Sequence, residues 1–241
     1  MRLNILCLSE MVIISKLNAS LQEFGDTIVY KNILNIEEIL VEAKDTKILE
    51  DTDVYIFQSK NAAIISKRYI QKFNKNSQFL AVGIYTAKAV RDNLGVRCTF
   101  PENNYSSKDL LNSEYLKATK NKKVAILKGE NGLSILSQKL QESNQVHEII
   151  VYKRTINKSA IVNDDFKKDC KNVVLCMSNS ILDYIIENFR DTIHNTKVQL
   201  IVPNKRFITD KTNVFDKSYV IDKIDDEIKY MKIFEEIREN K

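Results

Sequence analysis

The stretch from Asp53 to Gly95 opens with Val54-Tyr55-Ile56-Phe57-Gln58-Ser59-Lys60-Asn61-Ala62 and later reaches Ala81-Val82-Gly83-Ile84-Tyr85-Thr86-Ala87. Each part consists of an apolar run, a short turn, and apolar residues at helical spacing. Strand, turn and helix therefore occur twice in succession. This order is typical of an α/β protein with a parallel sheet.

The two turns lie where a buried strand leads into a helix. We predict that Ser59 caps the first helix beside Asn61, and that Thr86 caps the second. Gly83 lets the backbone approach a ligand closely. Unpaired N–H groups and the helix dipole favour anions at such turns. Helix capping and tight turns alone would also explain these residues, so the pattern gives a fold class without chemistry.

Composition and charge narrow the classes of function. The chain has 241 residues, of which 44% are apolar, and a net charge of +5 from 37 basic and 32 acidic side chains. It can form one large or two small domains with a real core. The densest basic cluster, Lys117 to Lys123, has four lysines and no aromatic residue. We interpret it as a solvated loop, and expect no nucleic-acid partner.

Cysteine and histidine usage argues against a metal site. The four cysteines contain no Cys-x-x-Cys pair, and His147 and His194 are isolated from each other and from any cysteine. A reduced, cytoplasmic protein is the simplest interpretation. Met1 to Glu10 is interrupted by Asn4 and predicts a first strand rather than a signal peptide. No segment approaches the ~20 apolar residues of a membrane span, so we expect no membrane association.

A repeat divides the rest of the chain. Strands ending in Val-Tyr-Lys occur at Val29-Tyr30-Lys31 and Val151-Tyr152-Lys153, and the run from Val173 to Ser180 resembles the one ending at Asn61. We expect a helix over 36–49 after the first of these strands. Equivalent turns at equal spacing indicate two similar α/β lobes.

The ordered motifs resemble the uroporphyrinogen-III synthase family. They are the stretch from Asp53 to Ala62, Ala81-Val82-Gly83-Ile84-Tyr85-Thr86-Ala87, Leu127-Lys128-Gly129-Glu130-Asn131-Gly132, Val151-Tyr152-Lys153 and Met177-Ser178-Asn179-Ser180. Each motif is short, but together they span most of the chain.

The resemblance implies a fold of two flavodoxin-like α/β lobes with parallel sheets, joined by a two-stranded β linker. Lobe one would comprise residues 1–33 and 156–241, and lobe two residues 34–155. The linker strands would lie at 27–33 and 149–155. This arrangement makes lobe one discontinuous in sequence.

The resemblance also implies an activity: cyclisation of the linear tetrapyrrole hydroxymethylbilane to uroporphyrinogen III, with inversion of the last pyrrole ring, in haem biosynthesis. No metal or cofactor is needed, because loss of a hydroxyl from the first ring leaves an electrophilic azafulvene that the last ring attacks. Spontaneous closure gives the uninverted isomer, so such an enzyme works by positioning its substrate. The family further implies a monomer, with possible hand-over of the substrate from hydroxymethylbilane synthase.

Carried over position by position, the resemblance places a site between the lobes. Tyr152 would assist departure of the hydroxyl, and Thr86 would be the other catalytic residue. The substrate-binding residues would be Ser59, Lys60, Asn61, Gly83, Gly129, Gly132, Ser178, Asn179, Ser180, Asn204 and Lys205. Without the resemblance, an edge-strand aromatic is the better interpretation of Tyr152, and with it the two interpretations are about even. Lys60, Lys88 and Lys128 are as well explained as solvated surface as they are as carboxylate partners.

The chain departs from the family pattern in lobe one. The usual Gly-x-x-Thr-Ala turn appears as Val202-Pro203-Asn204-Lys205-Arg206, and the arginine usual after the first strand is replaced around Ser9-Glu10. Pro203 removes an N–H that an anion could have used, although Lys205 or Arg206 can supply charge. Gln58 stands where threonine is common.

Two other functions stay open. The changed lobe-one turn is consistent with a non-catalytic bilobal module that binds tetrapyrroles or has a regulatory role. A nucleic-acid or regulatory protein that uses the basic surface ranks last, because no reading motif is present; it predicts salt-dependent binding to DNA or RNA.

Overall fold

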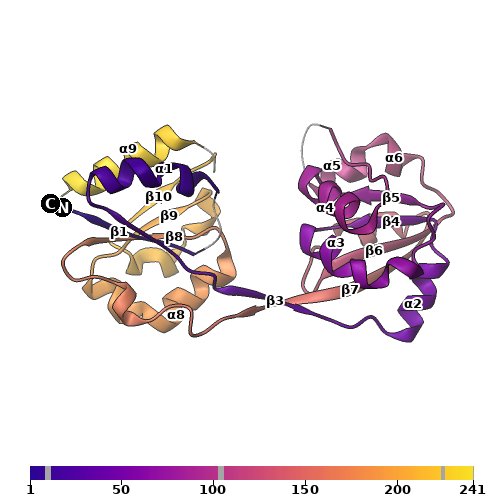
Figure 1. The fold of residues 1–241 in the computed structure, drawn as a ribbon, viewed down its shortest axis with the longest axis horizontal. Helices are drawn as coiled ribbons and strands as arrows, with labels where there is room; N and C mark the ends of the chain where they lie inside the picture. Colours follow the sequence, from indigo (N-terminus) through magenta and orange to yellow (C-terminus); the bar gives the residue numbers. More distant parts are fainter. Residues whose placement is uncertain (9–11, 103–105, 224–225, 241) are drawn as a thin grey trace. The chain divides into compact units, whose positions relative to one another are not determined.

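The computed structural model describes residues 1–8, 12–102, 106–223 and 226–240. The chain forms two compact units (Figure 1). Lobe one comprises Met1–Asn35 and Ile156–Lys241, and lobe two comprises Ile36–Thr155. The chain therefore passes between the units twice.

Lobe one is built on a parallel sheet of five strands with the order β10-β9-β8-β1-β2. The strands are β1 (Leu3–Cys7), β2 (Thr27–Tyr30), β8 (Lys171–Leu175), β9 (Gln199–Val202) and β10 (Lys217–Val220). The long helices are α1 (Val12–Glu23), α8 (Asn179–Asn195) and α9 (Glu227–Glu239), and the 3₁₀ turns are η2 (Asn163–Asp165), η3 (Lys205–Phe207) and η4 (Asp210–Val214).

Side chains along the lobe-one strands alternate between the two faces of the sheet, and each face has its own hydrophobic core. Leu6 and Val174 pack with the apolar face of α8, whereas Ile5 and Val173 pack with α1 and α9 on the opposite face. Successive strand residues point to opposite faces, so a sheet covered on both sides reads as a continuous apolar run. Figure 1 shows α8 on one side of this sheet, with α1 and α9 on the other.

Lobe two repeats this plan, with the strand order β3-β7-β6-β4-β5. Its strands are β3 (Leu34–Glu38), β4 (Val54–Phe57), β5 (Gln78–Ala81), β6 (Lys123–Gly129) and β7 (Gln145–Ile156). Its helices are α2 (Ala43–Glu50), α3 (Lys60–Ser66), α4 (Ile84–Leu94), α5 (Ser107–Asn112), α6 (Glu114–Lys117) and α7 (Ile135–Leu140), with the 3₁₀ helix η1 (Lys67–Lys72).

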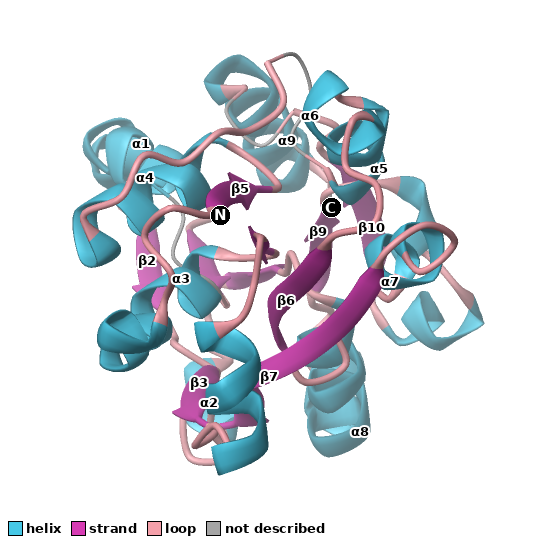
Figure 2. Ribbon diagram, turned by 90° about the vertical axis from the view of Figure 1, so that its right-hand side faces the viewer, coloured by secondary structure: helices cyan, strands magenta, loops and turns pink. Residues whose placement is uncertain are grey.

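Helices again cover both faces of the lobe-two sheet (Figure 2). Leu49, Ala63 and Val90 bring α2, α3 and α4 onto one face, and Leu116 and Leu136 bring α6 and α7 onto the other. The strands β4 to β7 are parallel. The edge strand β3 runs antiparallel to β7, because Ile39 donates from N to the carbonyl oxygen of Val151 at 2.9 Å while Thr155 donates to Glu37 at 2.6 Å.

Both sheets have the strand order of a doubly wound α/β fold. In lobe one the order reverses between β1 and β8, and in lobe two between β4 and β6. Ligands of such sheets bind outside the carboxyl ends of the strands at these switch points. The expectation of two α/β lobes with largely parallel sheets is confirmed.

The first crossing between lobes lies later in the chain than expected. Residues 27–30, which the family resemblance placed in the linker, form β2 and pair with β1 from Asn4↔Thr27 to Cys7↔Tyr30. The crossing segment is β3 instead. The expected helix over 36–49 is also wrong at its start, because Leu34, Asn35, Ile36 and Glu37 alternate with the period of an edge strand and the helix begins only at Ala43.

Candidate functional site

The carboxyl edge of the lobe-two sheet gathers the turns that the sequence singled out. Phe57 of β4 is level with Ala81 of β5 and with Leu127 of β6. The turns that follow these strands therefore leave the sheet at one edge. They carry Ser59, Gly83 and Gly129.

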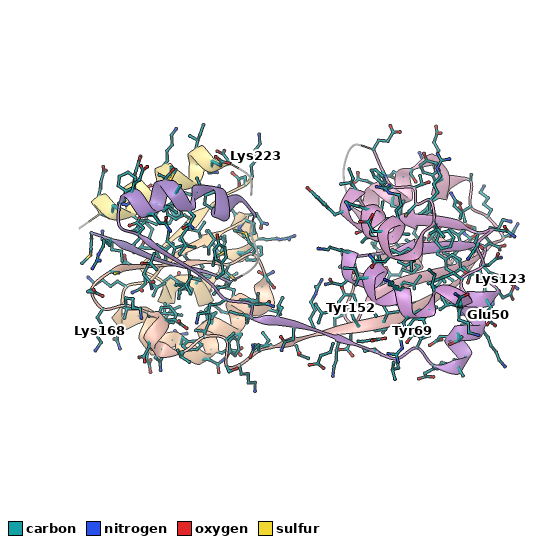
Figure 3. All side chains as sticks on the ribbon, viewed as in Figure 1. Glu50, Tyr69, Lys123, Tyr152, Lys168 and Lys223 are labelled. Carbon is teal, nitrogen blue, oxygen red and sulfur yellow. The ribbon has the colours of Figure 1, made fainter. Side chains whose placement is uncertain are left out.

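Tyr152 lies at this edge on β7 (Figure 3). Figure 3 shows it at one end of lobe two, with Lys123, the first residue of β6, at the other. Its hydroxyl is 3.0 Å from the hydroxyl of Ser59, and the residue is only 3% exposed. Ser59 also accepts a hydrogen bond of 3.1 Å from the N–H of Ala62, and so caps α3 as predicted. Capping and contact with Tyr152 thus use the same oxygen.

Gly129 makes room for the Tyr152 ring. A Cβ atom at position 129 would stand 2.5 Å from Cζ of Tyr152 and 2.9 Å from its hydroxyl oxygen. The pairing of β6 with β7 shifts here, from Lys128↔Ile150 to Gly129↔Tyr152. A β-bulge of this kind redirects a side chain beside a site. The phenol therefore reaches Ser59 only because residue 129 has no side chain.

Arg154 also reaches the Tyr152 hydroxyl. Its Nη2 donates to that oxygen at 3.3 Å, and its guanidinium carbon lies 5.7 Å from the ring centroid. Arg154 itself is exposed. Arg154 is not among the residues expected from the sequence, although a strand places positions 152 and 154 on the same face.

An ion pair between a buried lysine and a partly exposed glutamate supports the turn after β6. The Lys128 side chain is 4% exposed, and its ammonium lies 3.0 Å from a carboxylate oxygen of Glu148. The same oxygen accepts a hydrogen bond of 2.5 Å from Ser137. Burial alone would raise the pKa of Glu148, but these hydrogen bonds and the lysine charge outweigh it and leave the pKa below its ordinary value of 4.5. Lys128 is therefore a structural cation and not solvated surface.

One carbonyl of that turn is held from two strands. Lys128 donates to the oxygen of Leu133 at 3.4 Å, and Gln58, from the end of β4, donates to it at 3.0 Å. Gly132 lies against both, because a Cβ there would stand 2.9 Å from Cε of Lys128 and 3.2 Å from Oε1 of Gln58. The Gln58 side chain thus links the turn after β4 to the turn after β6. The glutamine that stands where the family commonly has threonine therefore has a structural role.

The remaining lobe-two candidates surround this cluster. Gly83 occupies the N-cap position of α4 with extended backbone, and no side chain caps that helix. The predicted cap by Thr86 is therefore wrong: Thr86 is the third residue of the helix and 7% exposed. Lys60 is exposed and Asn61 half-buried at the start of α3.

The lobe-one candidates divide between two turns. Ser178 occupies the N-cap position of α8, and its hydroxyl lies 3.0 Å from that of Ser180 rather than capping the helix. After β9, Asn204 accepts a hydrogen bond of 3.2 Å from the N–H of Arg206 and caps the short helix η3, beside the exposed Lys205. The changed turn thus leads into a 3₁₀ helix instead of an α-helix.

A cavity of about 470 Å³ connects these two lobe-one turns. It is lined by Asn179, Leu182, Asp183, Ile186, Arg206, Phe207, Thr209, Asp210, Lys211 and Thr212. Lys211 and Asp183 form an ion pair of 2.9 Å on its wall. Asn179 is therefore the candidate that lines a cavity. Ser9 and Glu10 lie outside the described residues.

A second cavity, of about 560 Å³, lies at the opposite edge of lobe two. Asp53, Gln78 and Lys122, which lie at the amino ends of strands, are among its lining residues. None of the candidate residues lines it. Within the described residues, no three His, Cys, Asp or Glu side chains group as a metal site requires, and no helix is long and apolar enough to cross a membrane.

Comparisons with known proteins agree with the motifs. A family model described as uroporphyrinogen-III synthase HemD matches residues 15–204. A crystal structure of a mutant uroporphyrinogen III synthase from Thermus thermophilus is similar over 96% of this chain and 98% of its own, with 12% identity and a TM-score of 0.55. The wild-type structure from the same bacterium has 12% identity over 97% and 99%, with a TM-score of 0.46. No curated protein matches.

The family model covers well over half of the chain, including the lobe-two turns at Ser59, Gly83 and Gly129, Tyr152 and the turn at Ser178. The chain belongs to the uroporphyrinogen-III synthase HemD family, the lyases that close the tetrapyrrole ring in haem biosynthesis.

Proposed function

We propose that this chain converts hydroxymethylbilane to uroporphyrinogen III at the carboxyl edge of its lobe-two sheet, with Tyr152 as the acid. The observation that carries the proposal is the Tyr152 hydroxyl, 3.0 Å from Ser59 and packed against Gly129. This contact places a proton donor, the phenol of Tyr152, beside the turn at Ser59, whose N–H groups can bind a carboxylate. Family membership supplies the reaction.

The first step is loss of the substrate hydroxyl. The O–H bond of Tyr152 breaks and its proton passes to the hydroxyl oxygen of the substrate. The C–O bond then breaks, and its electron pair leaves on water. The lone pair of the pyrrole nitrogen forms the new C=N bond of the azafulvene. The substituted α-carbon of the last ring attacks the azafulvene and gives a spiro intermediate; the bond from this carbon to the bridge of the third ring then breaks and re-forms at the other α-carbon of the last ring, which inverts it. The proton that this second carbon releases as the ring regains aromaticity restores the phenol.

The remaining candidates position the substrate, whose rings carry acetate and propionate groups. We propose that Lys60, Asn61, Gly83 and Gly132 contact these carboxylates in lobe two, and that Thr86 is the other catalytic residue. Ser178, Asn179, Ser180, Asn204 and Lys205 would contact them in lobe one. Holding a flexible chain in one geometry is how such a site favours inversion over spontaneous closure.

We also propose that the protein acts as a monomer in the cytoplasm and takes hydroxymethylbilane from its synthase. The four cysteines form no disulfide with one another, which suits a reducing compartment. Rapid hand-over suits a substrate that cyclises to the wrong isomer when left in solution. Ultracentrifugation with and without the synthase tests both the monomer and the hand-over.

A coupled assay tests the activity. Hydroxymethylbilane is supplied by its synthase, and the oxidised products are separated into type I and type III isomers. We expect type III product above the protein-free control. Tyr152→Phe should lower kcat by about 10²–10⁴-fold, because general acid catalysis contributes about that much.

Tyr184→Phe is the matched control. It removes another tyrosine hydroxyl with one hydrogen bond, of 3.0 Å to the carbonyl oxygen of Lys158, and should leave kcat unchanged. Only type I product from folded wild-type protein would contradict the proposed activity. Wild-type kcat in Tyr152→Phe would remove Tyr152 from its role.

A further inference from the structure

We infer that Arg154 stabilises the negative charge that develops on Tyr152 when the phenol gives up its proton. The inference rests on the proposed acid role of Tyr152 and assigns a function to Arg154. Nη2 of Arg154 lies 3.3 Å from the phenolic oxygen, and the guanidinium carbon lies 5.7 Å from the ring centroid. Both groups project from the same face of β7.

The direction of the hydrogen bonds follows from the chemistry of the partners. A guanidinium has donors and no acceptor, so the Tyr152 oxygen accepts from Arg154. The oxygen of Ser59 already accepts from the N–H of Ala62, and the Ser59 hydroxyl proton is free to point at Tyr152. In that arrangement the phenolic oxygen receives two hydrogen bonds. Its own proton is then free for the hydroxyl of the substrate.

The charge of Arg154 is available for this purpose. No carboxylate in the described part of the chain forms an ion pair with it, in contrast to the neighbouring Lys153, which lies 3.1 Å from Glu37. Because a guanidinium stays protonated throughout the working pH range, it is a permanent positive charge beside the phenol.

This placement favours the transition state over the ground state. Before proton transfer the Tyr152 oxygen is neutral and gains little from a nearby cation. As the O–H bond breaks, negative charge grows on that oxygen while the guanidinium and Ser59 already point at it. Donors fixed where charge develops lower the barrier without reorganisation. Arg154 therefore acts through Tyr152 as a positioning and charge-stabilising residue.

A double-mutant cycle tests the inference, with single-turnover rates and KM measured separately. Arg154→Met keeps an unbranched apolar stem and removes the guanidinium with its charge, and we expect a rate lower by about 10–100-fold with little change in KM. Arg154→Lys keeps a donor cation and should recover part of the rate. Lys153→Met, which removes an exposed cation from the next position of the same strand, should leave the rate unchanged.

The variant Tyr152→Phe/Arg154→Met separates action through the phenol from other roles. Residues that act as one unit are not additive, so Arg154→Met should lower the rate no further once the phenol is absent. An equal loss in the Phe background would overturn the inference, as would an effect on KM alone, which marks a carboxylate contact. A slow Tyr152→Phe with a normal Arg154→Met would overturn only the role of Arg154. A normal Tyr152→Phe would overturn the acid role itself.

Discussion

Gly129 is the residue on which the geometry of Tyr152 depends. Its backbone approaches the phenol so closely that even a methyl group would overlap the ring at 2.5 Å. Since residue 129 ends a buried strand, the ring must yield rather than the sheet. Position 129 requires glycine because the Tyr152 ring leaves no room for a side chain, and not because the backbone has a positive φ.

We expect Gly129→Ala to displace the Tyr152 hydroxyl from Ser59 and lower kcat about as far as Tyr152→Phe does. Overpacking should also cost about 1–3 kcal/mol of unfolding free energy. Assay of type III product and urea denaturation measure the two effects. Full activity in folded Gly129→Ala would show that the contact with Ser59 has no catalytic role.

The ion pair of Lys128 and Glu148 makes a pH-dependent prediction. The pKa of Glu148 is lowered in the fold, so its stabilisation is present above about pH 4.5 and is lost as pH falls through the lowered value. Glu148→Gln should therefore cost about 1.5–3 kcal/mol at pH 7, and less as the pH approaches the lowered value. Urea denaturation of both proteins across this pH range measures the difference.

Glu142→Gln provides the comparison for that experiment. Glu142 pairs with Lys139 at 2.7 Å, but both side chains are more than 60% exposed. Pairs in water contribute about 0–1 kcal/mol, so this variant should be close to wild type at every pH. A Glu148 variant that behaved in the same way would show that the pair of Lys128 and Glu148 does not support the turn.

Several site residues were predictable from sequence because their cause is local. Ser59 comes two residues after the end of an apolar run and caps the helix that begins at the next residue, as its position indicates. The roles of Lys128 and Arg154 were not found. The role of Lys128 depends on Glu148, a partner distant in the chain. The role of Arg154 depends on the bulge at Gly129, where the register between β6 and β7 shifts.

At the scale of elements, the buried carboxylate of Asp26 links α9 to the start of β1. Asp26, whose side chain is fully buried, accepts a hydrogen bond of 2.8 Å from the N–H of Leu3 and pairs with Arg238. The Arg238 guanidinium also lies over the Phe24 ring at 4.4 Å. The start of β1, the α1–β2 turn and α9 thus share a single anchor.

Asp26→Asn should destabilise lobe one by about 3–5 kcal/mol, because it leaves the cation of Arg238 buried without its partner. Asp222→Asn tests an exposed counterpart, since Asp222 pairs with Lys229 at 3.0 Å and is 71% exposed, and should change little. Urea unfolding of both variants measures the costs. Equal stabilities would contradict an anchor at Asp26.

Elements were predictable where apolar runs were long and buried, and less so at the crossing between lobes. A short alternating segment such as Leu34–Glu38 carries too few apolar residues to separate an edge strand from a helix. Its pairing with β7, a strand distant in the sequence, decides the outcome. The residues of Leu34–Glu38 themselves do not indicate that β7 is their partner strand.

At the scale of the molecule, the two lobes are built alike. Each has a five-stranded sheet whose order reverses once, and each has its own two cores within the described residues. The doubly wound order places a candidate site at the carboxyl edge of each sheet without reference to the other lobe. The central claim is that the tetrapyrrole binds to this edge in lobe two.

Amide hydrogen exchange with uroporphyrinogen III, held reduced and compared with the free protein, tests that claim most directly. The account predicts slower exchange in peptides covering 58–63, 83–87 and 129–135, and no change in peptides covering 74–78 and 114–122, which line the cavity of about 560 Å³ at the opposite edge. Protection confined to 74–78 and 114–122 would contradict it.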